Sequence, residues 1–233
     1  MFPIRDSIPS GTVPIVTLFI IVINSLIWIY EVSLGTRIDN FIIEYGLTPW
    51  RFTHYYLYHG GFWGNALMPL FSSIFMHAGW MHVIGNMWFL WIFGDNIEDR
   101  LGHFNYLVFY LLCGVGASLI HVGFNPGSKV PTIGASGAIS GVLGAYLISF
   151  PHARILTLLI IFIFIRLVEI PAFLYLVLWF GFQFLSSAAQ FGSQQDTGGV
   201  AYWAHMGGFV VGIVLLWLMP KKPPPRYWAR SEF

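Results

Sequence analysis

The sequence predicts an all-α membrane protein built as a bundle of six membrane-spanning helices. Of its 233 residues, 57% are hydrophobic and 9% are charged, whereas soluble domains carry about 25% charged residues. A chain exposed to lipid must satisfy its backbone polar groups within helices or a closed barrel. The apolar runs are too long for barrel strands and lack their alternation. A helical membrane bundle is therefore expected.

The net charge and the cysteine content argue against several classes of function. The net charge of +1 offers no basic surface for a nucleic acid. Cys113 is the single cysteine and lies within an apolar run, so no disulfide framework is expected. His54 and His59 are interpreted as interfacial histidines, with metal ligation the lesser alternative because no cysteine or carboxylate spacing accompanies them. Neither a cofactor nor a metal is expected.

The N-terminal part contains the first span and a long loop. Residues 1–12 form a short polar lead, and residues 13–34 are long enough to cross a bilayer, which takes about 20 residues. No small-residue cleavage site follows this run, so an uncleaved span is expected rather than a signal peptide. Residues 35–73 mix charges with many aromatic side chains, which is typical of a structured interfacial loop in the headgroup region.

Three further spans are expected before residue 151. The second covers residues 81–97 and ends in a charged turn, and the third covers residues 104–124. The fourth, residues 136–150, rises only about 22 Å, which is less than the hydrocarbon core of about 30 Å. Such a helix must begin or end inside the membrane, and this places Ser136 below one surface.

The stretch after the fourth span is ambiguous, because two charged residues and a proline interrupt it. Its first part, residues 155–165, is rich in β-branched and aromatic residues and could be a span or an extended segment near a membrane face. Two spans here would put His205 across the bilayer from Ser136. One span, roughly residues 171–189, would put both residues at the same end. We expect one span, followed by a sixth at residues 201–219.

The distribution of basic residues supports six spans. An even number of spans puts both termini on one side, and that side then collects most of the lysines and arginines, which is cytoplasmic by the positive-inside rule. Residues 220–233 would be a cytoplasmic tail, and the expected location is the plasma membrane of a prokaryote. The richer side holds Arg5, Arg100, Arg154, Arg166, Lys221, Lys222, Arg226 and Arg230, and the poorer side holds Arg37, Arg51 and Lys129.

Ser136 opens the fourth span within Gly134-Ala135-Ser136-Gly137. Two structural roles are open to its hydroxyl, namely capping the helix and close packing through the small residues up to Gly141. The same position offers free backbone N–H groups and the positive end of a helix dipole, which suit an oxyanion. The site therefore also suits a nucleophile.

His205 begins the sixth span within Ala204-His205-Met206-Gly207-Gly208-Phe209. It could be a structural hydrogen-bonding residue between helices. However, glycines on this span and on the fourth would let the two helices approach closely enough for the imidazole to reach Ser136. Neither span contains an acidic residue that could complete a triad, so a serine–histidine dyad is expected.

His82 and Asn86 lie four residues apart in the second span and share one helix face. Polar packing between helices is one interpretation. The other is that both side chains, together with the Ser136 backbone N–H, donate hydrogen bonds to a tetrahedral oxyanion. His77, just before this span, would support the network or face interfacial water.

These motifs resemble the signature motifs of the rhomboid family of intramembrane serine proteases. The resemblance extends from about residue 71 to residue 212 and includes His77 with His82-Val83-Ile84-Gly85-Asn86. It implies that Ser136 is the nucleophile, that His205 is the general base, and that His82, Asn86 and the Ser136 amide form the oxyanion site. It also implies substrates that are themselves single-pass membrane proteins.

Two functions other than proteolysis are also compatible with a helical membrane bundle. A catalytically inactive relative could bind or escort transmembrane clients, but both Ser136 and His205 are present. A transporter or channel is less favoured, because no span carries the series of charges that an ion path needs. A substrate is expected to arrive sideways, past the 192–200 loop and the aromatic side chains of the fifth span, namely Phe173, Trp179, Phe182 and Phe184. The sequence leaves the substrate and the oligomeric state open.

Overall fold

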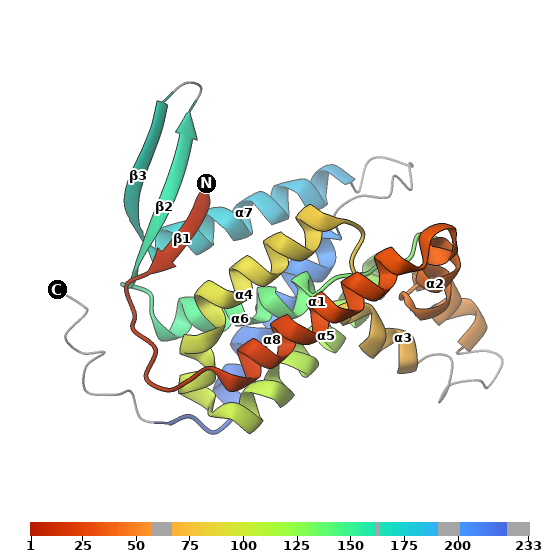
Figure 1. The fold of residues 1–233 in the computed structure, drawn as a ribbon, viewed down its shortest axis with the longest axis horizontal. Coiled ribbons are helices and arrows are strands. Elements are labelled where there is room, and N and C mark those ends of the chain that lie inside the picture. The colour runs from red at the N-terminus through yellow and green to blue at the C-terminus, as the bar shows by residue number, and fades with distance from the viewer. Residues whose placement is uncertain (57–66, 162–163, 191–200, 223–233) are drawn as a thin grey trace.

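Six apolar helices form the central bundle of the protein (Figure 1). The computed structural model describes residues 1–56, 67–161, 164–190 and 201–222. One apolar helix is found at each position where the sequence predicts a span. They are α1 (Ile15–Ser33), α4 (Trp80–Leu101), α5 (His103–Phe124), α6 (Ser136–Ser149), α7 (Ala172–Gln190) and α8 (Tyr202–Leu218).

The helices differ in how well their length fits a membrane. By length and composition, α1 and α5 could each cross a bilayer alone. A third candidate joins α4 to residues 67–75, which are bent by 87° relative to it. The helices α6, α7 and α8 are shorter apolar helices. The protein is thus a helical membrane protein, and the count of six spans stays a prediction.

Helix α6 lies inside the bundle. All ten residues from Gly137 to Tyr146 are buried, so every face of this helix is covered by protein. It packs against α4, α5, α7 and α8. A short helix surrounded in this way does not face lipid along its length, which is why its small residues suit it.

A buried carboxylate joins α1 to α4. Glu98 accepts hydrogen bonds from the backbone N–H groups of Val16 (2.9 Å) and Thr17 (2.8 Å), and from the Thr17 hydroxyl (2.7 Å). The first N–H groups of a helix have no partner within it, and a negative charge there is favourable. Glu98 therefore caps α1 and fixes it against the C-terminal end of α4.

The all-α prediction omits a three-stranded antiparallel sheet. Its strands are β1 (Phe2–Asp6), β2 (Arg154–Ile161) and β3 (Phe164–Pro171), in the order β1-β2-β3. Of the two alternatives for residues 155–165, the extended segment is correct and the span is wrong. The short polar lead supplies β1, which pairs Phe2 with Leu158.

The first loop is structured, as expected, in the part that the structure describes. It contains α2 (Ile38–Tyr45), a π-helical turn (Arg51–Tyr56), α3 (Leu67–Ser72) and a 3-10 turn (Ser73–Phe75). Leu47 and Thr132 exchange two backbone hydrogen bonds, of 3.2 and 2.8 Å, which attach the loop beside the start of α6. The exposed ring of His54 stacks on Trp50, whereas His59 lies outside the described residues.

Candidate active site

Ser136 and His205 lie within hydrogen-bonding distance. Ser136 is the first residue of α6, and His205 is in the first turn of α8. The distance between Ser136 Oγ and His205 Nε2 is 2.7 Å. His205 is buried and Ser136 is partly exposed. The two residues meet because residues 154–171 form a hairpin and only α7 intervenes, so that α6 and α8 begin at the same end of the bundle.

Glycines bring the backbones of α6 and α8 into direct contact. A Cβ atom on Gly208 would lie 2.0 Å from the carbonyl oxygen of Gly137, and one on Gly212 would lie 2.1 Å from that of Gly141. No real side chain fits such a space, so both positions require glycine. This close approach fixes the distance between the first turns of the two helices, and hence between Ser136 and His205.

Gln183 of α7 contacts the other nitrogen of the imidazole. Its Oε1 lies 3.0 Å from His205 Nδ1, and the Gln183 side chain is buried. An amide oxygen only accepts hydrogen bonds, so Nδ1 carries the proton and Nε2 presents its lone pair to the Ser136 hydroxyl. The expected two-residue arrangement is therefore extended by a third residue, which is an amide rather than an acid.

Sequence reasoning missed Gln183 because it searched for a carboxylate. The available signal was an isolated amide within the apolar residues 172–189, since a polar group is costly to bury in a membrane protein without a partner.

Two aromatic rings lie near the imidazole of His205. The ring of Trp179 lies 6.2 Å from that of His205, and the ring of Tyr202 lies 6.4 Å from it.

The His82 imidazole faces the segment that leads into α6. Its Nδ1 accepts a hydrogen bond from the Ala78 backbone N–H (3.3 Å), so its proton lies on Nε2. A Cβ atom on Gly134 would lie 2.7 Å from His82 Nε2 and 3.6 Å from Ser136 Oγ. Gly134 has φ +130°, a conformation that favours glycine. His82 Nε2 is thus an N–H donor near the serine, with no hydrogen-bond partner among the described residues.

Asn86 contributes a second donor from the same helix. Its side chain is buried, and among the described residues its Nδ2 has no hydrogen-bond partner. An unpaired buried donor costs about 1–3 kcal/mol, so such a group indicates an absent acceptor. The Ser136 amide is a third donor, because the first helical bond of α6 runs from Ile139 N–H to the Ala135 carbonyl (3.0 Å) and leaves the preceding amides unused.

The two serines at the start of α6 differ in their partners. Ser140 is buried and donates its hydroxyl hydrogen to the Ser136 carbonyl (2.6 Å). Ala135, not Ser136, occupies the N-cap position of α6, and Ser136 is the first helical residue. The capping role that the sequence left open for Ser136 is therefore not found, and its hydroxyl contacts His205 instead.

His77 lies behind His82. The two rings are 5.1 Å apart, and His77 is fully buried, so it does not face interfacial water. Its backbone N–H donates to the buried carboxylate of Glu31 on α1 (3.1 Å). Within the described part of the chain, neither ring nitrogen of His77 has a hydrogen-bond partner. Sequence reasoning gave no role to Glu31, which ties the segment before α4 to α1.

Together, the fold and this geometry define a helical membrane protein with a serine–histidine pair and hydrogen-bond donors beside it. The comparisons with known proteins agree on the family. Residues 64–222 match the family model of the Rhomboid domain. The chain belongs to the rhomboid family, which confirms the resemblance seen in the sequence motifs.

Several relatives carry rhomboid names. "Rhomboid-like protein 11, chloroplastic" of Arabidopsis thaliana is 32% identical over 206 residues, which is 86% of this chain and 67% of that protein. "Rhomboid protein 1, mitochondrial" of Saccharomyces cerevisiae is 31% identical over 181 residues, or 74% of this chain and 47% of the relative. The human "Presenilin-associated rhomboid-like protein, mitochondrial" is 36% identical over 89 residues, which is 37% of this chain and 24% of the relative. The match thus spans about half the length of the yeast protein.

Proposed function

We propose that this protein is an intramembrane serine endopeptidase that hydrolyses peptide bonds in or near transmembrane segments of other membrane proteins. The observation that carries the proposal is the 2.7 Å distance between Ser136 Oγ and His205 Nε2. A serine hydroxyl is a weak nucleophile unless a neighbouring base removes its proton. The imidazole, with Nδ1 held by Gln183, is that base.

In the proposed reaction, His205 Nε2 takes the proton as Ser136 Oγ attacks the substrate carbonyl carbon. The resulting oxyanion accepts hydrogen bonds from His82 Nε2–H, Asn86 Nδ2–H and the Ser136 amide. The C–N bond then breaks, and His205 gives the proton to the leaving amine. Water next attacks the acyl-enzyme with His205 again acting as base, and releases the second product and free Ser136.

The proposed substrate is a single-pass membrane protein whose helix unwinds locally at the cleaved bond. Carbonyl groups inside a helix are already hydrogen-bonded and are shielded by the neighbouring turns, so an intact helix cannot present one to Ser136. Access past α7 is supported by three exposed phenylalanines, Phe173, Phe182 and Phe184, which face away from the protein core. Trp179 does not belong with them, because it packs toward His205 and Phe209. The 192–200 loop lies outside the described residues.

The membrane arrangement is part of the proposal. We propose six spans, with both termini on the side that is richer in basic residues. The relatives named above are chloroplastic or mitochondrial, which does not fit the prokaryotic plasma membrane expected from the sequence. The contact between the backbones of Lys222 and Arg100 (2.8 Å) supports placing the C-terminal region at the same end as the turn after α4.

The test is cleavage of a tagged single-pass membrane protein by the full chain in lipid vesicles. Ser136→Ala should abolish cleavage, because it removes the proposed nucleophile. Ser140→Ala is the matched control, since it removes a hydroxyl of the same helix that bonds only to the backbone, and it should retain most activity. Cleavage by Ser136→Ala would refute the proposal. A folded wild-type chain that binds transmembrane segments without cleaving any would instead support an inactive client-binding relative.

A further inference from the structure

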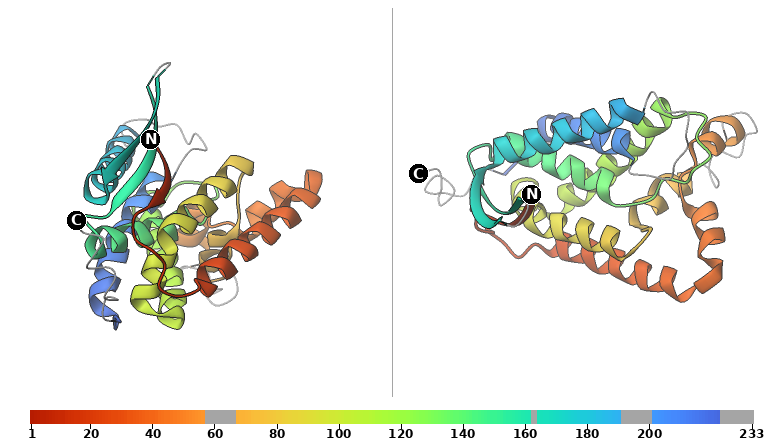
Figure 2. Two further views of the ribbon diagram at one scale, coloured as in Figure 1. Left: turned by 60° about the vertical axis from the view of Figure 1, so that its left-hand side comes forward. Right: turned by 90° about the horizontal axis from the view of Figure 1, so that it is seen from above.

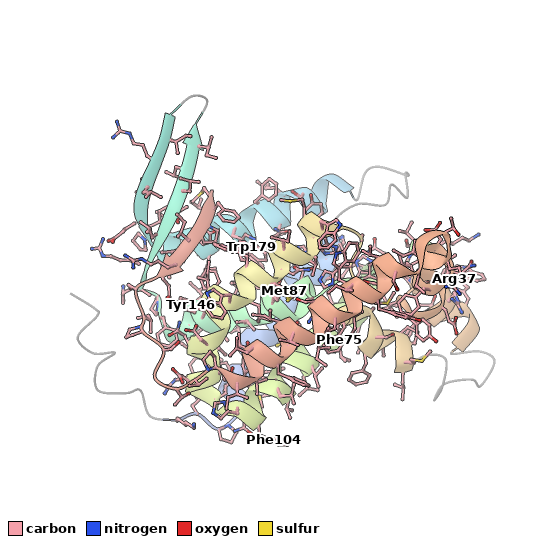
Figure 3. The ribbon with its side chains drawn as sticks, viewed as in Figure 1. Arg37, Phe75, Met87, Phe104, Tyr146 and Trp179 are labelled. Atoms are coloured by element: carbon pink, nitrogen blue, oxygen red, sulfur yellow. The ribbon has the colours of Figure 1, made fainter. Side chains whose placement is uncertain are left out.

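The β2–β3 hairpin has an apolar outer half. Two cross-strand pairs near its tip, Leu158 with Leu167 and Ile160 with Ile165, lie on one face of the sheet. Ile160, Ile165 and Leu167 are 62%, 67% and 59% exposed. They are not covered by the described part of the chain, and Figure 3 shows the side chains of the outer half of the hairpin standing clear of the helices. This is a contiguous apolar surface.

The opposite face of the hairpin carries few polar side chains. Its base, formed by Ile155 and Ile170, is buried against the bundle, and Val168 further out is exposed. Arg166, paired with Leu159, is the one charged side chain in the described part of the outer half. An antiparallel sheet with one face in water normally alternates apolar and polar residues. The outer half of this hairpin does not alternate, so it does not fit an aqueous environment.

The direction of the hairpin places this surface at a membrane boundary. In Figure 1 the hairpin leaves the bundle crosswise to α4 and α6, at the end away from the α6 N-terminus, and both views of Figure 2 agree. Because the helices cross the membrane, a segment crosswise to them at one end runs along the membrane surface. Helix α7 starts directly after β3 and carries exposed apolar side chains. The hairpin therefore extends over the lipid beside α7.

Charge and backbone hydrogen bonding limit how deep the hairpin can lie. Strand β3 is an edge strand, and the unpaired N–H and C=O groups on its outer side need water or headgroups, which excludes the hydrocarbon core. The exposed charged side chains of the sheet are mainly basic, namely Arg5, Arg154 and Arg166, with Glu169 lying 3.9 Å from Arg154. Basic side chains at this depth attract anionic headgroups.

We propose that the β2–β3 hairpin docks on the bilayer surface, with the apolar residues of its described outer half at the boundary between headgroups and acyl chains and its arginines bound to anionic phospholipid. The partner is the lipid surface itself. A second copy of this chain that pairs along β3 is the competing occupant, and the experiment separates the two.

The experiment measures the depth of a fluorophore on Ile165→Cys by quenching. Native Cys113 is buried, so the wild-type chain serves as the control for unwanted labelling. The full chain, with Ser136→Ala to make the readout independent of proteolysis, is placed in vesicles of phosphatidylcholine and phosphatidylglycerol. Quenchers are lipids with a doxyl group near the headgroup or near the chain end, and aqueous iodide. Glu169→Cys, on the same strand and face but at the polar base, is the matched control.

The proposal expects the label at residue 165 to be quenched more by the shallow doxyl lipid than by the deep one, and less by iodide than the label at residue 169. Equal iodide quenching at the two positions, with no doxyl quenching, would overturn it. Protection from iodide without doxyl quenching, together with energy transfer between differently labelled copies, would overturn it in favour of a second chain.

The arginines are tested by Arg154→Gln combined with Arg166→Gln. In the starting protein, shallow quenching at residue 165 should increase when phosphatidylglycerol is added to phosphatidylcholine, and the double variant should lose this increase. Arg37→Gln, at the opposite end of the protein in Figure 3, is the control and should keep it. An unchanged response in the double variant would remove the arginines from the proposal.

Discussion

Helices α6 and α8 touch through their backbones, whereas α7 packs against them through side chains. Gly144, like Gly208 and Gly212, has no room for a Cβ atom, which would lie 2.3 Å from the Phe209 carbonyl oxygen. On α7, by contrast, a Cβ atom on Gly181 would meet nothing within 4 Å. Ser136 and His205 thus come from two helices in backbone contact, and Gln183 comes from a helix that reaches them through its side chains.

The position and the orientation of the His205 imidazole therefore depend on different helices. The backbone contact of α6 and α8 sets the distance between Ser136 and His205. The side chain that selects the tautomer of His205 sits on the helix that a substrate is proposed to pass. Displacement of α7 would therefore remove Gln183 from His205 Nδ1 and leave the serine and histidine in place, so the full site would re-form only when α7 returns.

The largest effect is expected from filling the contact between α6 and α8. Gly212→Ala puts a methyl group 2.1 Å from the Gly141 carbonyl oxygen, so the helices must separate. Overpacking of this kind costs about 1–3 kcal/mol or more, and we expect a lower unfolding temperature and loss of nearly all cleavage. Gly181→Ala is the control and should unfold at the same or a higher temperature, because alanine favours a helix by about 1 kcal/mol. Equal effects of the two variants would contradict the difference described here between the α6–α8 contact and α7.

An intermediate effect is expected from Gln183→Ala. The imidazole would lose its orienting acceptor while keeping its distance from Ser136, so kcat should fall about tenfold with little change in KM. Gln183→Glu keeps an acceptor at the same place and should recover part of the rate. Its negative charge would favour the protonated imidazole, so the acid limb of the pH–rate profile should move to higher pH. A purely structural role of Gln183 would leave that limb unmoved.

The smallest effect is expected at Asp6, which joins the sheet to the bundle. Burial raises the pKa of this carboxyl to about 7, and repulsion from Asp95 adds to the shift, against the opposing hydrogen bond from Tyr146. The pKa of Asp6 in the folded protein is above its ordinary value of 3.8. The protonated carboxyl therefore stabilises the fold fully below pH 3.8, and this stabilisation is lost as the pH rises through about 7. The unfolding temperature should fall between about pH 4 and about pH 7. Asp6→Asn should flatten this slope, and an unchanged slope would exclude Asp6 as its source.

Local motifs predicted more of the site than of the sheet. The sequence indicates Ser136, His205, His82 and Asn86 as candidates, because each sits at a helix end or on one helix face with a recognisable spacing. The sheet was missed because β1 pairs with residues about 150 positions away, and no local pattern records such a partner. Gln183 was missed for a similar reason, since its role depends on how α7 packs against α8. Sequence periodicity fixes neither contact.

The most direct test of the central claim is the site at which a fluorophosphonate reacts. The full chain, and the chain with His205→Ala, would be treated with the reagent in lipid vesicles, and the modified residue would be located by peptide mass spectrometry. We expect the wild-type chain to carry the adduct on Ser136 and not on Ser140, and His205→Ala to carry almost none. An adduct on Ser140, or undiminished labelling of Ser136 without the imidazole, would contradict the account.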